Sequence, residues 1–187
     1  MNPIGAFVFI WKYVIDIYVF IILARFILQV VRADFYNPTS QFIVKATTPV
    51  LKPLRRLIPG IGGIDVAAIV LMTILIIIKW GVLKTIKGSP FELLSFSFII
   101  LQSMVIILLN FYMFCIFISV IMSWIAQGHY NPFADLLRQI TEPVMAPARR
   151  LLPPMGGMDF SPIIVLLLIS TIKILFYLDN QRLEGLL

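Results

Sequence analysis

Cysteine and histidine are nearly absent from this 187-residue chain, which has one of each, Cys115 and His129. A single cysteine excludes an internal disulfide, a CxxCH haem attachment site and a thiolate metal cluster. A single histidine excludes multi-histidine zinc sites and bis-histidine haem ligation, although one axial haem ligand remains arithmetically available. We therefore expect no cofactor, and the cysteine content leaves the redox compartment undetermined.

Charged residues are also scarce, at 13% of the chain, whereas apolar residues make up 60%. The mean hydropathy of +1.01 lies far outside the usual range of soluble domains and indicates an integral membrane protein. The first apolar run, residues 4–31, follows no basic residue and exceeds the apolar core of a signal peptide. It also lacks a clear small-residue cleavage site, so we expect a retained helix.

Most of the chain is a duplication. The sequence RRLIPGIGGID at 55–65 returns as RRLLPPMGGMD at 149–159, and the same shift of 94 positions gives fourteen identities in the thirty residues 36–65. We call 36–65 and 130–159 the repeated segments. Each lies between two apolar runs, which divides the chain into a first repeat at 1–89 and a second at 90–187.

Four apolar runs predict an all-α fold with four transmembrane helices, because each run is long enough for a ~30 Å hydrocarbon core. They lie at about 4–31, 66–83, 98–125 and 160–178. Each repeat forms a helical hairpin that enters the membrane from the same side, so the repeats are parallel and related by a pseudo-twofold axis along the membrane normal.

The third helix is expected to begin before its apolar run. The sequence SPFE fits a capping box with Ser89 as N-cap, Pro90 at the first helical position and Glu92 two positions later. A helix from 90 to 125 would be about 54 Å long at 1.5 Å per residue. It would have to tilt, bend or project from the membrane.

Basic residues indicate the orientation of the chain. The repeated segments and their edges hold Arg32, Lys45, Lys52, Arg55, Arg56, Arg138, Arg149 and Arg150. The connection between the repeats holds Lys84 and Lys87, with Lys79 near its edge. By the positive-inside rule, the repeated segments are cytoplasmic and both termini lie on the outer side.

Both repeated segments open with YNP, in which Asn37 or Asn131 is a suitable N-cap and the proline suits the first helical position. An amphipathic helix lying in the membrane interface should follow, more clearly in the second copy. Its apolar residues are Phe133, Leu136, Leu137, Ile140 and Val144. Prolines four apart, at 49 and 53 and at 143 and 147, are then expected to break or kink each helix before the arginine pair.

The glycine pairs Gly62–Gly63 and Gly156–Gly157 predict a tight turn with positive φ before the next span. A phosphate-binding loop is not expected, because the glycines are followed by an aspartate and not by lysine with serine or threonine. Asp65 and Asp159 each stand one residue before an apolar run, where an N-cap belongs.

The duplicated arginine pairs, Arg55–Arg56 and Arg149–Arg150, have two interpretations. They are topological anchors that reach lipid phosphates, or they form an electropositive face that binds a partner protein or anionic lipid bidentately. Direct binding of nucleic acid is not expected, because no aromatic stacking pattern accompanies the arginines.

Two charged residues fall inside the spans, Asp16 and Lys79, with Asn110 and Lys173 at the duplicated positions. Counted from the cytoplasmic ends, Asp16 and Lys79 differ in depth by about 3 Å, so they could pair across the first hairpin. In the alternative, both lysines reach the outer interface and Asp16 pairs with Lys12. A third interpretation is a transport pathway, with Asp16 as a cation site.

The pattern P-x-x-x-P-x-RR-x-x-P-x-x-GG-x-D, its second copy and four spans in about 190 residues resemble the YggT family of bacterial membrane proteins, which has chloroplast relatives. The resemblance covers essentially the whole chain. It implies a bacterial inner-membrane protein with no established enzymatic activity. The outer side, where the distribution of basic residues places both termini, is then the periplasm. Relatives are associated with cell-division gene clusters, nucleoid organisation, osmotic stress and plastid cytochrome b6 assembly.

From these observations we expect a non-enzymatic scaffold or assembly factor, since no nucleophile, base or metal cluster is present. Its expected partners are membrane lipids and other membrane proteins, and homo-oligomerisation stays open. The alternative function is a small ion or solute transport component involved in osmotic homeostasis, with Asp16, Gln102 and Asn110 along its route.

Overall fold

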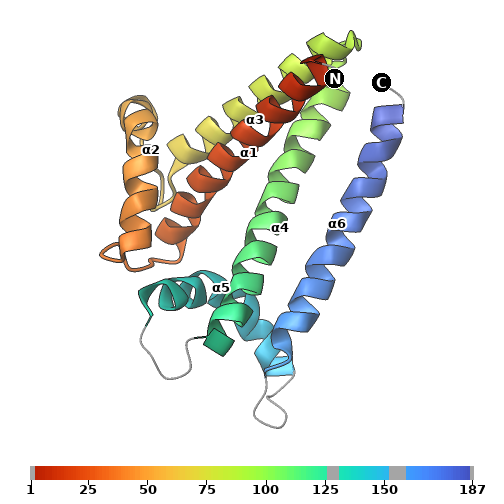
Figure 1. Ribbon diagram of the computed structural model, residues 1–187. Helices are drawn as coiled ribbons and strands as arrows, with labels where there is room; N and C mark the ends of the chain where they lie inside the picture. Colours follow the sequence, from red (N-terminus) through yellow and green to blue (C-terminus); the bar gives the residue numbers. More distant parts are fainter. Residues whose placement is uncertain (1–2, 126–130, 152–158, 186–187) are drawn as a thin grey trace.

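A computed structural model describes residues 3–125, 131–151 and 159–185, and within these ranges every regular element is a helix. The elements in order are α1 Pro3–Val30, α2 Pro38–Leu57, α3 Val66–Lys87, α4 Leu93–Ile125, α5 Pro132–Leu151 and α6 Ser161–Gly185 (Figure 1). The element order repeats once, as a long helix, a shorter amphipathic helix and a second long helix. The all-α prediction is therefore confirmed for the described part of the chain.

Three of these helices, α1, α3 and α4, are long and apolar enough to cross a membrane. In α6 the corresponding apolar stretch is Ser161–Phe176, which is shorter. Large apolar side chains such as Phe9, Leu101 and Leu167 are exposed on α1, α4 and α6. An outer surface of this kind suits lipid and not water, so the chain is a membrane protein.

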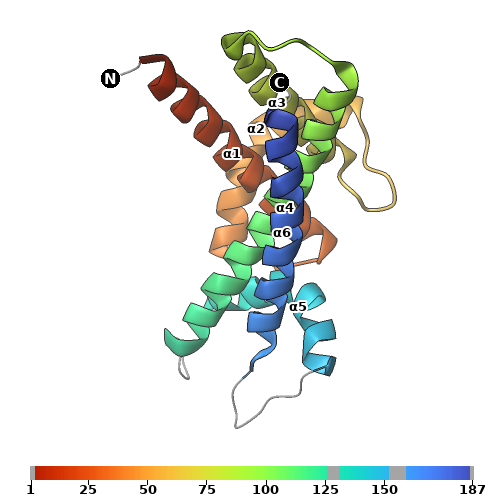
Figure 2. The same ribbon diagram turned by 90° about the vertical axis from the view of Figure 1, so that its right-hand side faces the viewer.

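The long helices pack as two pairs, α1 with α3 and α4 with α6, and the pairs meet where α4 contacts α1 and α3 (Figures 1 and 2). At the contact between the repeats, Phe20 of α1 lies edge-on against Phe114 of α4, with ring centroids 5.6 Å apart. These two phenylalanines occupy duplicated positions. The contact between α1 and α4 therefore brings the same point of each repeat together.

Three of the predicted N-caps, at Asn37, Asn131 and Asp65, are present, whereas α6 begins two residues after Asp159, whose Oδ1 accepts from the Ser161 amide at 2.9 Å. Asn37 Oδ1 accepts a hydrogen bond from the Thr39 amide at 2.9 Å, and Asn131 Oδ1 accepts one from the Phe133 amide at 2.9 Å. Asp65 caps α3 by accepting from the Ala68 amide at 3.3 Å. These bonds satisfy amides that have no partner within their own helix.

The third long helix begins before its apolar run at 98, as predicted, but it begins at Leu93 and not at Pro90. Gly88 has a left-handed φ of 67°, and the Ser89 amide donates to the Lys84 carbonyl at 3.2 Å. These bonds form a Schellman-type end to α3. Ser89 thus terminates one helix and cannot cap the next.

The sequence predicts a break or a kink at each proline pair, and the break is absent, because both helices continue through their prolines. Pro49 and Pro53 lie inside α2, and Pro143 and Pro147 lie inside α5. All four prolines are exposed, and each pair has the four-residue spacing that places both rings on one side of its helix. The carbonyls that lose an amide partner thus face outward, where water or lipid headgroups can satisfy them. The arginine pairs consequently lie in the last turn of each helix and not beyond its end.

The two amphipathic helices are placed differently. In Figure 1, α2 stands beside the lower half of α1, whereas α5 lies across the lower ends of α4 and α6. Polar contacts connect the two helices through the loop before α2. The Asn37 side-chain amide donates to the Pro132 carbonyl at 2.6 Å, and Gln139 Oε1 accepts from the Asp34 amide at 3.0 Å. The starts of the two repeated segments therefore lie together.

Candidate functional site

The repeated segments end in a duplicated ion pair. Arg55, in the last turn of α2, donates through Nε and Nη2 to Oδ2 of Asp65, the N-cap of α3. In the second repeat, Arg149 Nε donates to Asp159 Oδ2 at 2.9 Å. Each pair spans ten residues and fastens the end of an amphipathic helix to the beginning of the next long helix.

These two ion pairs differ in burial. The Asp65 side chain is 3% exposed, whereas that of Asp159 is 39% exposed. Arg149 has a second carboxylate partner, Glu142, at 2.7 Å. Burial alone would raise the pKa of the Asp159 carboxyl, but hydrogen bonds from Ser161 and Arg149 outweigh it and the pKa is lowered. This pair therefore contributes stability above the ordinary carboxyl range and loses it as the pH falls through the lowered pKa.

The other member of each arginine pair remains available. Arg56 and Arg150 are exposed, and neither makes an ion pair or side-chain hydrogen bond with the residues that the structure describes. The four predicted binding arginines thus divide into two kinds. Arg55 and Arg149 hold the fold together, and Arg56 and Arg150 extend from the ends of α2 and α5.

The glycine turn before α3 agrees with the prediction, because Gly62 and Gly63 have φ values of 60° and 84°. Ile61 and Ile64 close this turn with two backbone hydrogen bonds of 3.2 and 3.0 Å. Gln29 of α1 donates to the Gly63 carbonyl at 3.0 Å and so holds the turn against the first span. The corresponding Gly156 and Gly157 lie outside the described residues.

Arg25, whose role was not predicted from the sequence, lies in α1 at its contact with α2. Arg25 is 8% exposed, and its Nη1 donates to the Val44 carbonyl at 3.1 Å and to the hydroxyls of Thr47 and Thr48 at 2.7 and 3.0 Å. All three acceptors are on α2. Arg25 therefore holds α2 against α1, which explains why α2 stands upright where α5 does not.

The second repeat has no equivalent of this joint. Ser119 occupies the position of Arg25, and Glu142 occupies that of Thr48. Glu142 instead pairs with Arg149 of its own helix. The charge that joins two helices in the first repeat is thus replaced by a charge pair within one helix in the second.

Within the spans, Lys79 Nζ of α3 lies 2.6 Å from Asp16 Oδ1 of α1. The Lys79 side chain is 5% exposed and that of Asp16 is 30% exposed. Asp16 therefore pairs across the first hairpin and not with Lys12, which resolves the two alternatives for Lys79 in favour of the ion pair. Neighbouring Trp80 donates to Ser103 Oγ at 2.7 Å and connects α3 to α4.

The duplicated residues do not repeat this contact. Neither Lys173 nor Asn110 has a side-chain hydrogen bond to any described residue, although both are partly exposed. The nearest polar connections between α4 and α6 lie elsewhere: Gln102 donates to the Phe176 carbonyl, and Ser170 lies 3.9 Å from Met113 Sδ. The expected meeting of Asn110 and Lys173 is therefore absent.

The difference in burial between the two arginine–aspartate pairs leads to a testable prediction. Asp65→Asn keeps a capping oxygen but removes the negative charge that faces Arg55. This change should lower the free energy of unfolding by about 2 kcal/mol, because the Asp65 carboxylate is buried. The matched change Asp159→Asn should cost less than about 1 kcal/mol, since its pair is exposed. Thermal unfolding of both variants in one detergent measures the difference. Equal shifts in the thermal midpoints of the two variants would show that the burial of Asp65 does not make its ion pair more stabilising than that of Asp159.

Comparison with known proteins places this architecture in a family. A profile of the CCB3/YggT family matches residues 4–86 and 98–178. An uncharacterised protein of Pseudomonas aeruginosa, PA0392, is 47% identical, with 97% of this chain and 93% of that protein covered. The uncharacterised YggT of Escherichia coli K12 is 41% identical, with 95% of both chains covered.

No solved structure matches the chain. The two family matches coincide with the two repeats and divide between α3 and α4, where the structure passes from one helix pair to the next. On these grounds the chain belongs to the CCB3/YggT family.

Proposed function

We propose that this protein is a non-enzymatic scaffold or assembly factor of the bacterial inner membrane. In this proposal α1, α3, α4 and α6 are four spans arranged as two hairpins, and α2 and α5 are cytoplasmic. The exposed Arg56 and Arg150 bind anionic lipid or acidic surfaces of membrane-protein partners. Cell division, nucleoid organisation and membrane-complex assembly are the settings that the family suggests.

The observation that carries the proposal is the unequal use of each arginine pair. One arginine is held by a carboxylate of the chain and fixes the helix end, while its neighbour is exposed. An arginine that only fixes the membrane topology needs its positive charge but no fixed orientation of its side chain. A guanidinium at a fixed helix end is suited to bidentate recognition of phosphate or carboxylate.

The proposed topology is tested by cysteine labelling in intact cells, in a Cys115→Ala background. Lys52→Cys and Arg138→Cys lie at exposed positions of α2 and α5 and should resist an impermeant thiol reagent. Lys87→Cys, at the exposed end of α3, should react. The reverse pattern would invert the orientation and remove the arginines from the cytoplasm.

The alternative is a small transport component for ions or solutes. Asp16 is the residue that favours it, because its carboxylate remains 30% exposed at membrane depth. Against it, the ion pair with Lys79 already neutralises that charge.

Flux measurements on purified protein in liposomes separate the two functions. We expect no ion flux from the wild type, with partners that co-purify from native membranes and are lost when the exposed arginines are replaced. Flux that disappears on Asp16→Asn would establish the alternative.

A further inference from the structure

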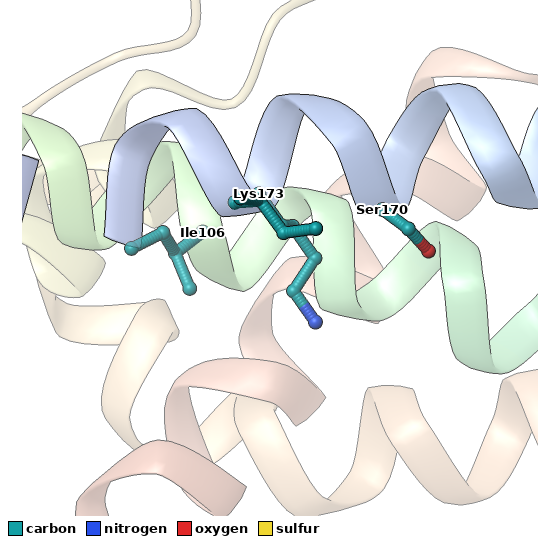
Figure 3. Close-up of a pocket in the computed structure, with 4 residues that line it drawn as sticks. Ile106, Ser170 and Lys173 are labelled. Atoms are coloured by element: carbon teal, nitrogen blue, oxygen red, sulfur yellow. The ribbon is translucent and has the colours of Figure 1, made fainter. Parts of the chain in front are cut away.

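A cavity of about 260 Å³ lies between α4 and α6. Its lining residues are Ile106 of α4 and Ser170, Lys173 and Ile174 of α6 (Figure 3). Three of these side chains are apolar or carry a small hydroxyl, and the fourth carries a full positive charge. Figure 3 shows the Lys173 side chain extending sideways from α6 toward α4. The cavity has room for a side chain, so a single charged group could enter it.

Lys173 lies in the outer third of the membrane-spanning part of α6, three residues before the end of the described apolar stretch Ser161–Phe176. It follows Asp159, at the beginning of that span, by 14 residues, which correspond to about 21 Å of helix. A lysine at this depth in a ~30 Å core is costly without a partner. Its ammonium has no ion pair or hydrogen bond in the described part of the chain. The charge is therefore compensated by a group outside this part of the chain, either at the outer interface or on a partner helix.

The second unsatisfied group is on the facing helix. Asn110 lies one turn from Ile106 on α4, and Met113, which approaches Ser170, follows three residues later. Asn110 is therefore on the α4 face that is turned toward α6, and its amide also has no partner among the described residues. An ammonium and an amide, neither with a partner among the described residues, thus lie on facing helices, the ammonium in the lining of the cavity and the amide one turn from the lining residue Ile106.

The first repeat shows how such a lysine is satisfied. At the duplicated position Lys79 is compensated by a carboxylate on a neighbouring apolar helix, Asp16 of α1. In the second repeat that carboxylate is replaced by Asn110. The second repeat therefore has the lysine at the duplicated position without an internal counter-ion among the described residues.

We propose that the groove between α4 and α6 is a binding site for a transmembrane helix of another protein, and that this helix carries an aspartate or glutamate that pairs with Lys173. The partner's carboxylate takes the place that Asp16 has beside Lys79, and Asn110 donates to it from α4. The inference rests on the proposed scaffold function and specifies the chemistry of one partner.

Two other occupants fit the observations less well. An anionic lipid presents its phosphate at the membrane surface, whereas Lys173 points sideways at a depth about 9 Å short of the far interface of a ~30 Å core. A second copy of this chain would have to supply Asp16, the acidic residue among the described parts of its spans, and that residue is already paired with Lys79.

Site-specific photocrosslinking in native membranes tests the proposal. A photoreactive amino acid replaces Ile106 inside the groove, and the matched control replaces Leu168, which is exposed on another side of α6. We expect an adduct with a membrane protein from position 106, mapped to a transmembrane segment that contains Asp or Glu. Position 168 should give that adduct at least fivefold more weakly.

Two substitutions then test the charge. Lys173→Met keeps the side-chain length and should reduce the adduct at least fivefold. Asn110→Asp should reduce it similarly, because it supplies an internal carboxylate as in the first repeat, and it keeps the test valid if Lys173→Met fails to fold. An adduct unchanged by both, adducts confined to lipid or to a second copy, or no adduct at all would overturn the proposal. Arg56→Ala with Arg150→Ala should release the partner or lipid that the arginines bind and leave the adduct of the groove intact, because the groove partner is held by Lys173; failure of the arginine site is thus separately visible.

Discussion

Lys79→Ala should lower the free energy of unfolding of the purified protein by on the order of 3 kcal/mol, and its thermal midpoint should fall strongly. The substitution leaves the Asp16 carboxylate within an apolar hairpin without the ammonium that lies 2.6 Å away. Asp16→Ala should cost a similar amount, because the Lys79 ammonium is almost fully buried. Each single change removes one charge and leaves the other uncompensated.

The double variant identifies the cause. If the ion pair stabilises the hairpin, Asp16→Ala with Lys79→Ala should cost clearly less than the sum of the single changes. Lys173→Ala is the matched control and should be milder, since Lys173 has no carboxylate partner in the described chain. Midpoints compared in one detergent are sufficient, because only differences are used. Strictly additive shifts would show that the pair has no energetic role.

The second large effect is expected at Arg25. Arg25→Met removes the charge-assisted hydrogen bonds to α2, in which the two N–H groups of Nη1 are shared among three acceptors; one such bond is worth about 1.5 kcal/mol or more in a buried setting. The hydroxyls of Thr47 and Thr48 keep bonds to carbonyls of their own helix, so the change releases α2 without leaving them unsatisfied. Hydrogen exchange should accelerate in α2 and stay unchanged in α5.

Two controls accompany this measurement. Ser119→Ala, at the duplicated position, should affect neither helix. Arg25→Lys should protect α2 only in part, because an ammonium cannot reproduce the planar geometry of a guanidinium that reaches three acceptors. Unchanged exchange in α2 of Arg25→Met would show that apolar packing alone holds the helix.

Much of the fold could be predicted because the duplication doubles every local pattern. Asn37, Asn131 and Asp65 are caps whose chemistry depends on neighbours within three residues, and the structure has all three. The pair of Asp16 and Lys79 was accessible because helix rise converts residue number into depth. Helix capping and the depth of a residue in its span can therefore be predicted from a single sequence.

The missed features depend on the angles between helices. The role of Arg25 requires α2 to fold back along α1, and no periodicity reports that angle. One indication was present: Arg25 and Thr48 change together, to Ser119 and Glu142, between the two copies. The prolines were misjudged for a related reason, since their cost depends on whether the freed carbonyls face solvent or a packed neighbour.

Co-purification of partner proteins and phospholipid from native membranes tests directly whether the exposed arginines bind partners or anionic lipid. The account predicts that Arg56→Ala with Arg150→Ala inserts normally, loses bound partner or anionic lipid at least fivefold, and makes the remaining binding less sensitive to salt. Lys87→Ala, at an exposed basic residue in the connection between the repeats, should bind as the wild type does. Unchanged binding in the double variant would show that Arg56 and Arg150 do not bind partners or anionic lipid and serve only to fix the membrane topology.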